Sequence, residues 1–142
     1  MLKRNSMGKI MDEPIRKMVT KRLIGVISGT TIQEGVRRML EFDIGFLVIT
    51  SGKDVVGFMT HTDIKRAIAD GRSMDDPVDT IMTREPRAVD INTSVREALE
   101  IMSKNRYKRL LVTENEEVAG IITRWDIEDI DKQRLETFIS RE

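Results

Sequence analysis

The sequence predicts an α+β fold made of two β-α-β-β-α repeats related by a pseudo-twofold axis. The main observation is an internal repeat: shifted by 63 positions, residues 14–69 match residues 77–132 without a gap, and 13 of 56 positions are identical. Only about 3 identities are expected from ordinary residue usage. A second observation is that helical spacing of apolar residues gives way to strand-like runs at the same points of both copies. A duplicated unit of this size needs its neighbour to bury its apolar face.

Each repeat is expected to open with a short helix. Pro14 and Pro77 each follow an acidic residue. Proline at the first helical position, with an acidic N-cap such as Asp76 before it, is a helix-start signal. We therefore expect helices of a turn or two that end near Thr20 and Thr83.

A capping-box pattern predicts where the long helix of each repeat begins. Thr31 with Glu34, and Ser94 with Glu97, have the required spacing of three residues. Apolar residues then recur at helical intervals, which places one stripe of each helix in the core.

Strands and a closing helix complete each repeat. Extended, apolar or β-branched segments predict strands at residues 24–26, 44–50 and 55–60, and again at residues 87–89, 107–113 and 118–123. Helices are expected at residues 61–70 and 124–133. The expected organisation is a flexible tail at 1–9, a first repeat at 10–71, a linker at 72–76, a second repeat at 77–133 and a helical extension at 134–142.

Composition narrows the class of protein. The 142 residues suit one compact domain or two half-domains, and a formal net charge of zero argues against a dedicated nucleic-acid binder. The sequence has no cysteine and one histidine, which excludes thiolate metal sites and argues against a histidine-based one. No apolar run approaches a membrane span and no hydrophobic signal region is visible, so we expect a cytoplasmic protein.

The pattern Gly-apolar-apolar-Thr-x-x-Asp ends the last strand of each repeat. It contains Thr60 with Asp63 and, 63 positions later, Thr123 with Asp126. Where a strand meets a helix, such a hydroxyl suits a phosphate oxygen, and the carboxylate can accept hydrogen bonds from two adjacent hydroxyls, as in ribose. Alternatively, the threonine caps the helix and the aspartate lies in its favourable first turn. Recurrence in both copies favours a binding site, although duplicated caps remain open.

The β-α-β-β-α unit, its tandem pairing and this repeated ending resemble the cystathionine-β-synthase (CBS) domain, arranged as a stand-alone CBS pair or Bateman module. The resemblance covers residues 14–132. It implies that the repeats pack through their sheets and leave two clefts related by a pseudo-dyad. It also implies that the clefts bind an adenosine-containing ligand such as AMP, ADP, ATP or S-adenosylmethionine, and that two pairs form a disc-shaped homodimer.

The same resemblance implies that each cleft takes its ribose residues from one repeat and most of its adenine pocket from the other. One cleft would combine Thr123 and Asp126 with adenine contacts from Thr20, Gly25, Ile44, Gly45 and Ile121. The other would combine Thr60 and Asp63 with contacts from Phe58, Thr83, Ala88, Tyr107 and Lys108. Phosphate contacts are implied for His61, Lys108, Arg109 and Arg124.

The copies differ in bulk where a long strand begins, since Lys108 takes the place of Gly45. Gly45 leaves room for a base in the Asp126 cleft, whereas Tyr107 and Lys108 either stack on a base or fill the other cleft. We therefore expect the Asp126 cleft to be the occupied one. Arg109 would be a phosphate donor shared by both clefts; the alternative is a solvated strand end.

The expected function is regulatory rather than enzymatic, because no nucleophile–base constellation accompanies His61. Ligand binding would shift the angle between the repeats, which requires different affinities for two states, and the response would pass to an unidentified effector protein. We expect no cofactor besides the regulatory nucleotide and no metal. Trp125 is assigned to surface or dimer packing. The alternatives are a structural dimerisation module and a nucleic-acid-binding protein that uses Lys3, Arg4, Lys9, Arg37 and Arg38.

Overall fold

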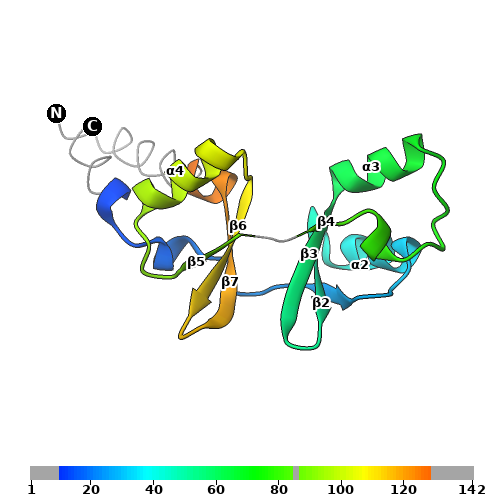
Figure 1. Ribbon diagram of the computed structural model, residues 1–142, viewed down its shortest axis with the longest axis horizontal. Coiled ribbons are helices and arrows are strands. Elements are labelled where there is room, and N and C mark those ends of the chain that lie inside the picture. The colour runs from blue at the N-terminus through cyan, green and yellow to red at the C-terminus, as the bar shows by residue number, and fades with distance from the viewer. Residues whose placement is uncertain (1–9, 85–86, 129–142) are drawn as a thin grey trace. The chain divides into compact units, whose positions relative to one another are not determined.

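The computed structural model describes residues 10–84 and 87–128 of the chain. The chain divides into two compact units: residues 23–86, called here the first-repeat unit, and residues 1–22 with 87–142, called the second-repeat unit. Each unit has its own sheet (Figure 1). Each also has its own apolar core. The predicted α+β class, with two β-α-β-β-α repeats, is confirmed.

The first-repeat unit contains a four-stranded sheet in the order β1-β2-β3-β4. Its strands are β1 (Gly25–Ile27), β2 (Phe46–Ser51), β3 (Asp54–Thr60) and β4 (Thr83–Arg84). β1 is parallel to β2, and the remaining neighbours are antiparallel. β4 lies within the predicted second repeat, residues 77–133. The sheet of the first-repeat unit is therefore completed by a strand from the second repeat.

Helices α2 (Ile32–Phe42) and α3 (His61–Ala69) lie on one face of this sheet (Figure 1). α2 begins where the Thr31 hydroxyl accepts a hydrogen bond from the Glu34 N–H, which is the hydroxyl half of the predicted capping box. The helices and sheet share a core that also includes a residue of the 3₁₀ turn η2 (Val78–Thr80). Its buried members are Ile32, Met39, Leu47, Ile49, Met59 and Val78.

The second-repeat unit follows the same plan with a three-stranded sheet in the order β5-β6-β7. The strands are β5 (Ala88–Asp90), β6 (Arg109–Glu114) and β7 (Glu117–Thr123). Helix α4 (Val95–Asn105) begins where the Ser94 hydroxyl accepts a hydrogen bond from the Glu97 N–H. Residues 124–128 are helical, and the 3₁₀ turn η1 (Ile15–Met18) covers the core with Ile15 and Met18.

The predicted opening helices are short, as expected, but their caps and their helical form differ from the prediction. Each is a single 3₁₀ turn, η1 or η2, and ends before Thr20 or Thr83. Pro14 and Pro77 are extended and occupy the N-cap position, so the acidic residue before each proline is not the cap.

Tertiary hydrogen bonds explain why these helices are short. The Ile15 N–H donates to the Thr93 carbonyl, and the Val78 N–H donates to the Thr30 carbonyl. These bonds hold the first residue of each 3₁₀ turn next to the start of another helix. A single helical turn is unstable by itself, so these tertiary bonds decide where the turn forms.

Several sequence predictions stay untested. The tail at 1–9 and the extension at 134–142 lie outside the described residues, and the predicted repeat and linker boundaries remain predictions. Among residues 10–84 and 87–128, no helix has the length and apolar character needed to cross a bilayer.

Candidate functional site

The first Thr-x-x-Asp pair lies where β3 passes into α3. The Asp63 carboxylate oxygen Oδ2 accepts hydrogen bonds from the Thr60 N–H and the Thr60 hydroxyl, both at 2.9 Å. In return, the Asp63 N–H lies 3.3 Å from the Thr60 Oγ1 that caps it. Thr60 and Asp63 therefore form a reciprocal capping box. Asp63 is only 7 % exposed and is the one buried charged side chain among the described residues.

The second pair repeats this arrangement where β7 passes into the helical residues 124–128. Asp126 Oδ2 accepts a hydrogen bond from the Thr123 N–H at 3.0 Å, and the Asp126 N–H donates to Thr123 Oγ1 at 3.0 Å. Asp126 is half-buried. The other carboxylate oxygen, Oδ1, receives no hydrogen bond from the described part of the chain.

Both pairs thus have the capping role that the sequence left open. This role occupies one oxygen of each carboxylate and orients the side chain rigidly at the end of a strand. A carboxylate held in this way still carries a second oxygen for a ligand hydroxyl, so capping and binding are compatible. The difference between the two pairs lies in that second oxygen.

A third threonine approaches each pair from a neighbouring segment. Thr83 in β4 is paired with Phe58 in β3, and its hydroxyl lies 3.5 Å from Asp63 Oδ1. In the second-repeat unit, Thr20 exchanges two backbone hydrogen bonds with Ile121 in β7, at 2.9 and 3.0 Å. Both threonines therefore stand opposite the residue two positions before the site threonine.

Glycine makes these close approaches possible. A Cβ at Gly57 would lie 2.6 Å from the Thr83 carbonyl oxygen, and a Cβ at Gly120 would overlap the Thr20 carbonyl oxygen. Real Cβ atoms do not approach a backbone oxygen this closely. The glycine of the repeated pattern is therefore required so that the segment carrying Thr20 or Thr83 can lie against the sheet.

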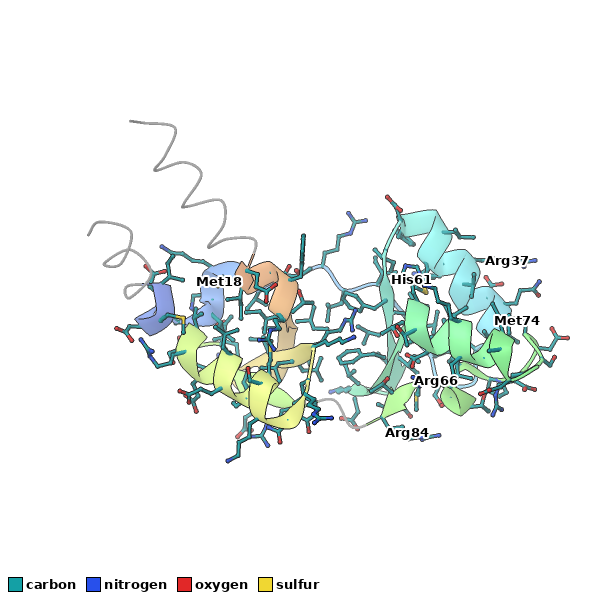
Figure 2. The ribbon with its side chains drawn as sticks, turned by 90° about the horizontal axis from the view of Figure 1, so that it is seen from above. Met18, Arg37, His61, Arg66, Met74 and Arg84 are labelled. Atoms are coloured by element: carbon teal, nitrogen blue, oxygen red, sulfur yellow. The ribbon has the colours of Figure 1, made fainter. Side chains whose placement is uncertain are left out.

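The predicted phosphate residues lie near the same strand ends. His61 is the first residue of α3 (Figure 2), and its ring would lie 3.6 Å from a Cβ at Gly45. In the second-repeat unit, the Arg124 N–H donates to the Lys108 carbonyl at 3.1 Å. The Arg124 side chain also pairs with Glu128 at 3.3 Å.

The predicted adenine contacts are divided between the two units. Phe58 is buried and packs edge-on against Phe46, and Ile121 is buried in β7. The first-repeat unit contains Gly25, Ile44, Gly45, Phe58, Thr60, His61, Asp63 and Thr83. The second-repeat unit contains Thr20, Ala88, Tyr107, Lys108, Arg109, Ile121, Thr123, Arg124 and Asp126. Each predicted cleft draws on both units, so both clefts remain predictions.

Trp125 is 72 % exposed, in agreement with its assignment to the surface.

Sequence reasoning missed the residue that holds the Thr83 segment in place. Asp79 in η2 accepts a hydrogen bond from the Ser28 hydroxyl and a second, at 2.7 Å, from the Gly29 N–H. These two bonds, that of the Ser28 hydroxyl first, lower the pKa of Asp79 below its ordinary value of 3.8. Arg84 in β4 then donates to the Asp79 carbonyl at 2.9 Å (Figure 2).

The Thr20 segment is held at the equivalent position by an opposite charge. Arg16 in η1 donates to Glu114 at 2.5 Å and lies 3.3 Å from the Asn92 side-chain oxygen. The signal that could have revealed both anchors is the charge inversion between Arg16 and Asp79, which lie 63 positions apart in an otherwise matching repeat.

Comparisons with known proteins agree with this architecture. The CBS domain family model matches residues 11–70 and 78–131. An uncharacterised 17.7 kDa protein of Acidianus ambivalens is 32 % identical over 119 residues, which cover 82 % of this chain and 72 % of the relative.

Two solved structures extend the comparison. An uncharacterised conserved protein from Pyrococcus horikoshii is 40 % identical, with a TM-score of 0.77 over 86 % of this chain and 94 % of the other. The CBS domain pair of protein MJ0100, solved with 5′-methylthioadenosine and S-adenosyl-L-methionine, is 25 % identical, with a TM-score of 0.72 over 82 % and 98 % of the two chains. Because the family model matches both repeats, this chain belongs to the CBS domain family and contains two CBS domains in tandem.

Proposed function

We propose that this chain is a regulatory module that binds an adenosine-containing small molecule between its two CBS repeats. The observation that carries the proposal is the repeated strand-to-helix junction, at which a threonine fixes an aspartate with a reciprocal capping box. The MJ0100 pair, which shares this fold, was solved with two adenosine-containing ligands. The role is proposed as regulatory rather than catalytic.

The ligand chemistry follows from the Asp126 carboxylate. The adjacent hydroxyls of a ribose are two donors about as far apart as two carboxylate oxygens, so one aspartate can accept both. Asp126 Oδ2 has one hydrogen bond, from Thr123, and Oδ1 has none from the described residues. The Thr123 hydroxyl and the cations Lys108, Arg109 and Arg124 would then face a phosphate or another polar group on the 5′ side.

The proposed ligands are AMP, ADP, ATP and S-adenosylmethionine. A phosphorylated ligand would use the basic residues, whereas the base would contact the apolar and glycine positions predicted from the sequence. Gly45 is one of these positions, and a Cβ there would be in ordinary contact with the His61 ring at 3.6 Å.

The proposed response is a change in the arrangement of the repeats that is passed to an effector protein in the cytoplasm. A homodimer is part of this proposal. Leu40 on α2 and Ile68 on α3, which are 76 % and 63 % exposed, are the residues that we propose for contact with a second copy. Analytical ultracentrifugation with and without ligand tests the dimer directly.

The alternative of nucleic-acid binding has less support. Arg37 projects from α2 (Figure 2) and is paired with Glu34. The Arg38 guanidinium lies 5.1 Å from the centre of the Phe42 ring and donates to the Gly25 carbonyl, so it serves packing within its own unit. Lys3, Arg4 and Lys9 lie outside the described residues. Tight oligonucleotide binding with a steep salt dependence would favour this alternative.

Calorimetric titration of ligand-free protein with AMP, ATP, S-adenosylmethionine and NAD tests the proposal. Saturable binding of at least one of them is expected. For a ligand that binds, Asp126→Ala should weaken binding by about 1–3 kcal/mol because it removes hydrogen bonds to a charged group. Glu117→Ala, at the other end of β7, is the matched control and should bind normally.

A second comparison separates ribose recognition from general adenine binding. AMP should bind more tightly than 2′-deoxy-AMP to the wild type, and this preference should disappear in Asp126→Ala. If all four ligands of the panel fail to bind, the proposed function is wrong and the two junctions are only helix caps.

A further inference from the structure

The two Thr-x-x-Asp junctions differ in how completely their own unit satisfies the carboxylate. Asp63 Oδ2 accepts two hydrogen bonds from Thr60, and the Thr83 hydroxyl lies 3.5 Å from Oδ1. Both oxygens of Asp63 therefore have a neighbouring donor, and the residue is almost completely buried. A ligand diol would have to displace the Thr83 hydroxyl before it could bind.

Asp126 remains open by comparison. Within the described ranges 10–84 and 87–128, its side chain accepts one hydrogen bond, from the Thr123 N–H to Oδ2, and the residue is half-buried. Thr20 is the counterpart of Thr83, but the structure contains no hydrogen bond between Thr20 and Asp126. The same residue types at the same positions thus leave one carboxylate satisfied and the other accessible.

The Thr83 segment is held where it is by several contacts. β4 pairs with β3 over two residues, Gly57 with Arg84 and Phe58 with Thr83. Arg84 is bonded to the Asp79 carbonyl, and the Asp79 carboxylate is bonded to the turn after β1. The Thr20 segment is also held, by two backbone hydrogen bonds to Ile121, but no hydrogen bond joins Thr20 to Asp126. The backbone of Thr83 is thus fixed where its hydroxyl can reach Asp63 Oδ1.

We propose that Thr83 closes the Asp63 junction, so that each chain binds a single ligand diol, at Asp126. This inference rests on the proposed function for its ligand and identifies Thr83 as the residue that determines which junction binds. The Thr83 hydroxyl, 3.5 Å from Asp63 Oδ1, takes the place of one ligand hydroxyl.

The first test needs no ligand. Unfolding midpoints are measured for Thr83→Val, Asp63→Ala and the double variant, and the same cycle is measured for Thr20→Val and Asp126→Ala. If Thr83 bonds to Asp63, the first double variant should lose less stability than the sum of its single variants. The second cycle should be additive. Additive behaviour in the first cycle would overturn the proposal. Asp63→Asn replaces Asp63→Ala if the alanine variant does not fold.

The second test is the stoichiometry of AMP and S-adenosylmethionine binding by calorimetry. The wild type should bind one ligand per chain, and this binding should be weakened at least about fivefold in Asp126→Ala but unchanged in Asp63→Ala. Thr83→Ala removes the hydroxyl and the methyl group and should raise the stoichiometry to two. The added site should disappear in Thr83→Ala with Asp63→Ala.

Matched variants complete this test. Thr83→Ser keeps the hydroxyl and should keep one site, and Thr20→Ala should not add a site. Two equivalent sites in the wild type, or equal loss of binding in Asp63→Ala and Asp126→Ala, would reject the closure. If neither ligand binds, the proposed function fails, and the unfolding cycle alone decides whether Thr83 satisfies Asp63.

Discussion

Arg16 in η1 and Asp79 in η2 occupy equivalent positions of the repeat and have opposite charges. Arg16 bonds to Glu114 and Asn92 of the second-repeat unit, and Asp79 bonds to Ser28 and Gly29 of the first-repeat unit. Each charge is complementary to its partners, because Arg16 meets acceptors on Glu114, the last residue of β6, and on Asn92, whereas Asp79 meets donors on Ser28 and Gly29.

The two turns also differ in the residue that bonds to the backbone N–H. Asp90 accepts a hydrogen bond from the Asn92 N–H, and the Asn92 side-chain oxygen lies 3.3 Å from Arg16. The residue equivalent to Asp90 is Ile27, which has no acceptor in its side chain, so the Gly29 N–H is bonded by Asp79 instead. The opposite charges of Arg16 and Asp79 thus suit the hydrogen-bonding groups of the unit in which each residue lies.

Charge reversal at Arg16 should be more damaging than truncation. Arg16→Ala should lower the free energy of unfolding by at most about 1 kcal/mol, because the pair with Glu114 is nearly half exposed. Arg16→Asp should lower it further, since like charges then face each other. Urea unfolding at low salt and at 1 M salt measures both effects, and the difference between the variants should shrink as salt screens the charges. Lys17→Ala is the control, and equal stability of both Arg16 variants would contradict the prediction.

The stability supplied by Asp79 should be lost in acid. Because its pKa is lowered in the folded protein, the carboxylate stabilises the fold at pH values above its unfolded pKa, and this contribution disappears as the pH falls through the folded pKa, below 3.8. Asp79→Asn should therefore be less stable than the wild type at pH 7, and the difference should vanish at the most acidic pH. Urea unfolding from pH 7 downward tests this, and a difference that stays constant with pH would count against the assigned cause.

Gly120→Ala should destabilise the second-repeat unit. The added Cβ would collide with the Thr20 carbonyl and the Val19 side chain, and such overpacking typically costs about 1–3 kcal/mol. Gly45→Ala is the matched control, because its Cβ would make an ordinary contact with the His61 ring at 3.6 Å. Thermal unfolding should show a clear loss for the first variant and a small change for the second. In a ligand titration, Gly45→Ala should nevertheless weaken binding if adenine lies against this residue.

The Thr123 cap gives a separate prediction. Thr123→Ala removes the oxygen that accepts the Asp126 N–H and should lower the free energy of unfolding by about 1 kcal/mol. Thr123→Ser keeps a capping hydroxyl and should restore most of that loss. Chemical unfolding measures the pair, and equal destabilisation by both substitutions would show that the methyl group rather than the cap is responsible.

The order of secondary structure was predictable because its signals are local. The capping residues Thr31 and Ser94 lie where their spacing placed them, and strands alternate with helices in each repeat as expected. The turn at Asn115 and Glu116, where both residues have positive φ, forms the hairpin expected between two β-branched runs. Such features depend on a few neighbouring residues.

The duplicated α+β unit and the position of each Thr-x-x-Asp junction are predictable from the residue pattern, because a repeat and its periodicity are visible in the chain itself. Tertiary structure alone decided that the opening helices stop after one turn, because Ile15 and Val78 donate to distant carbonyls. It also decided that Asp63 and Asp126 differ. Their local sequences match, and only the segment folded back against each sheet settles whether the carboxylate meets a hydroxyl of its own chain.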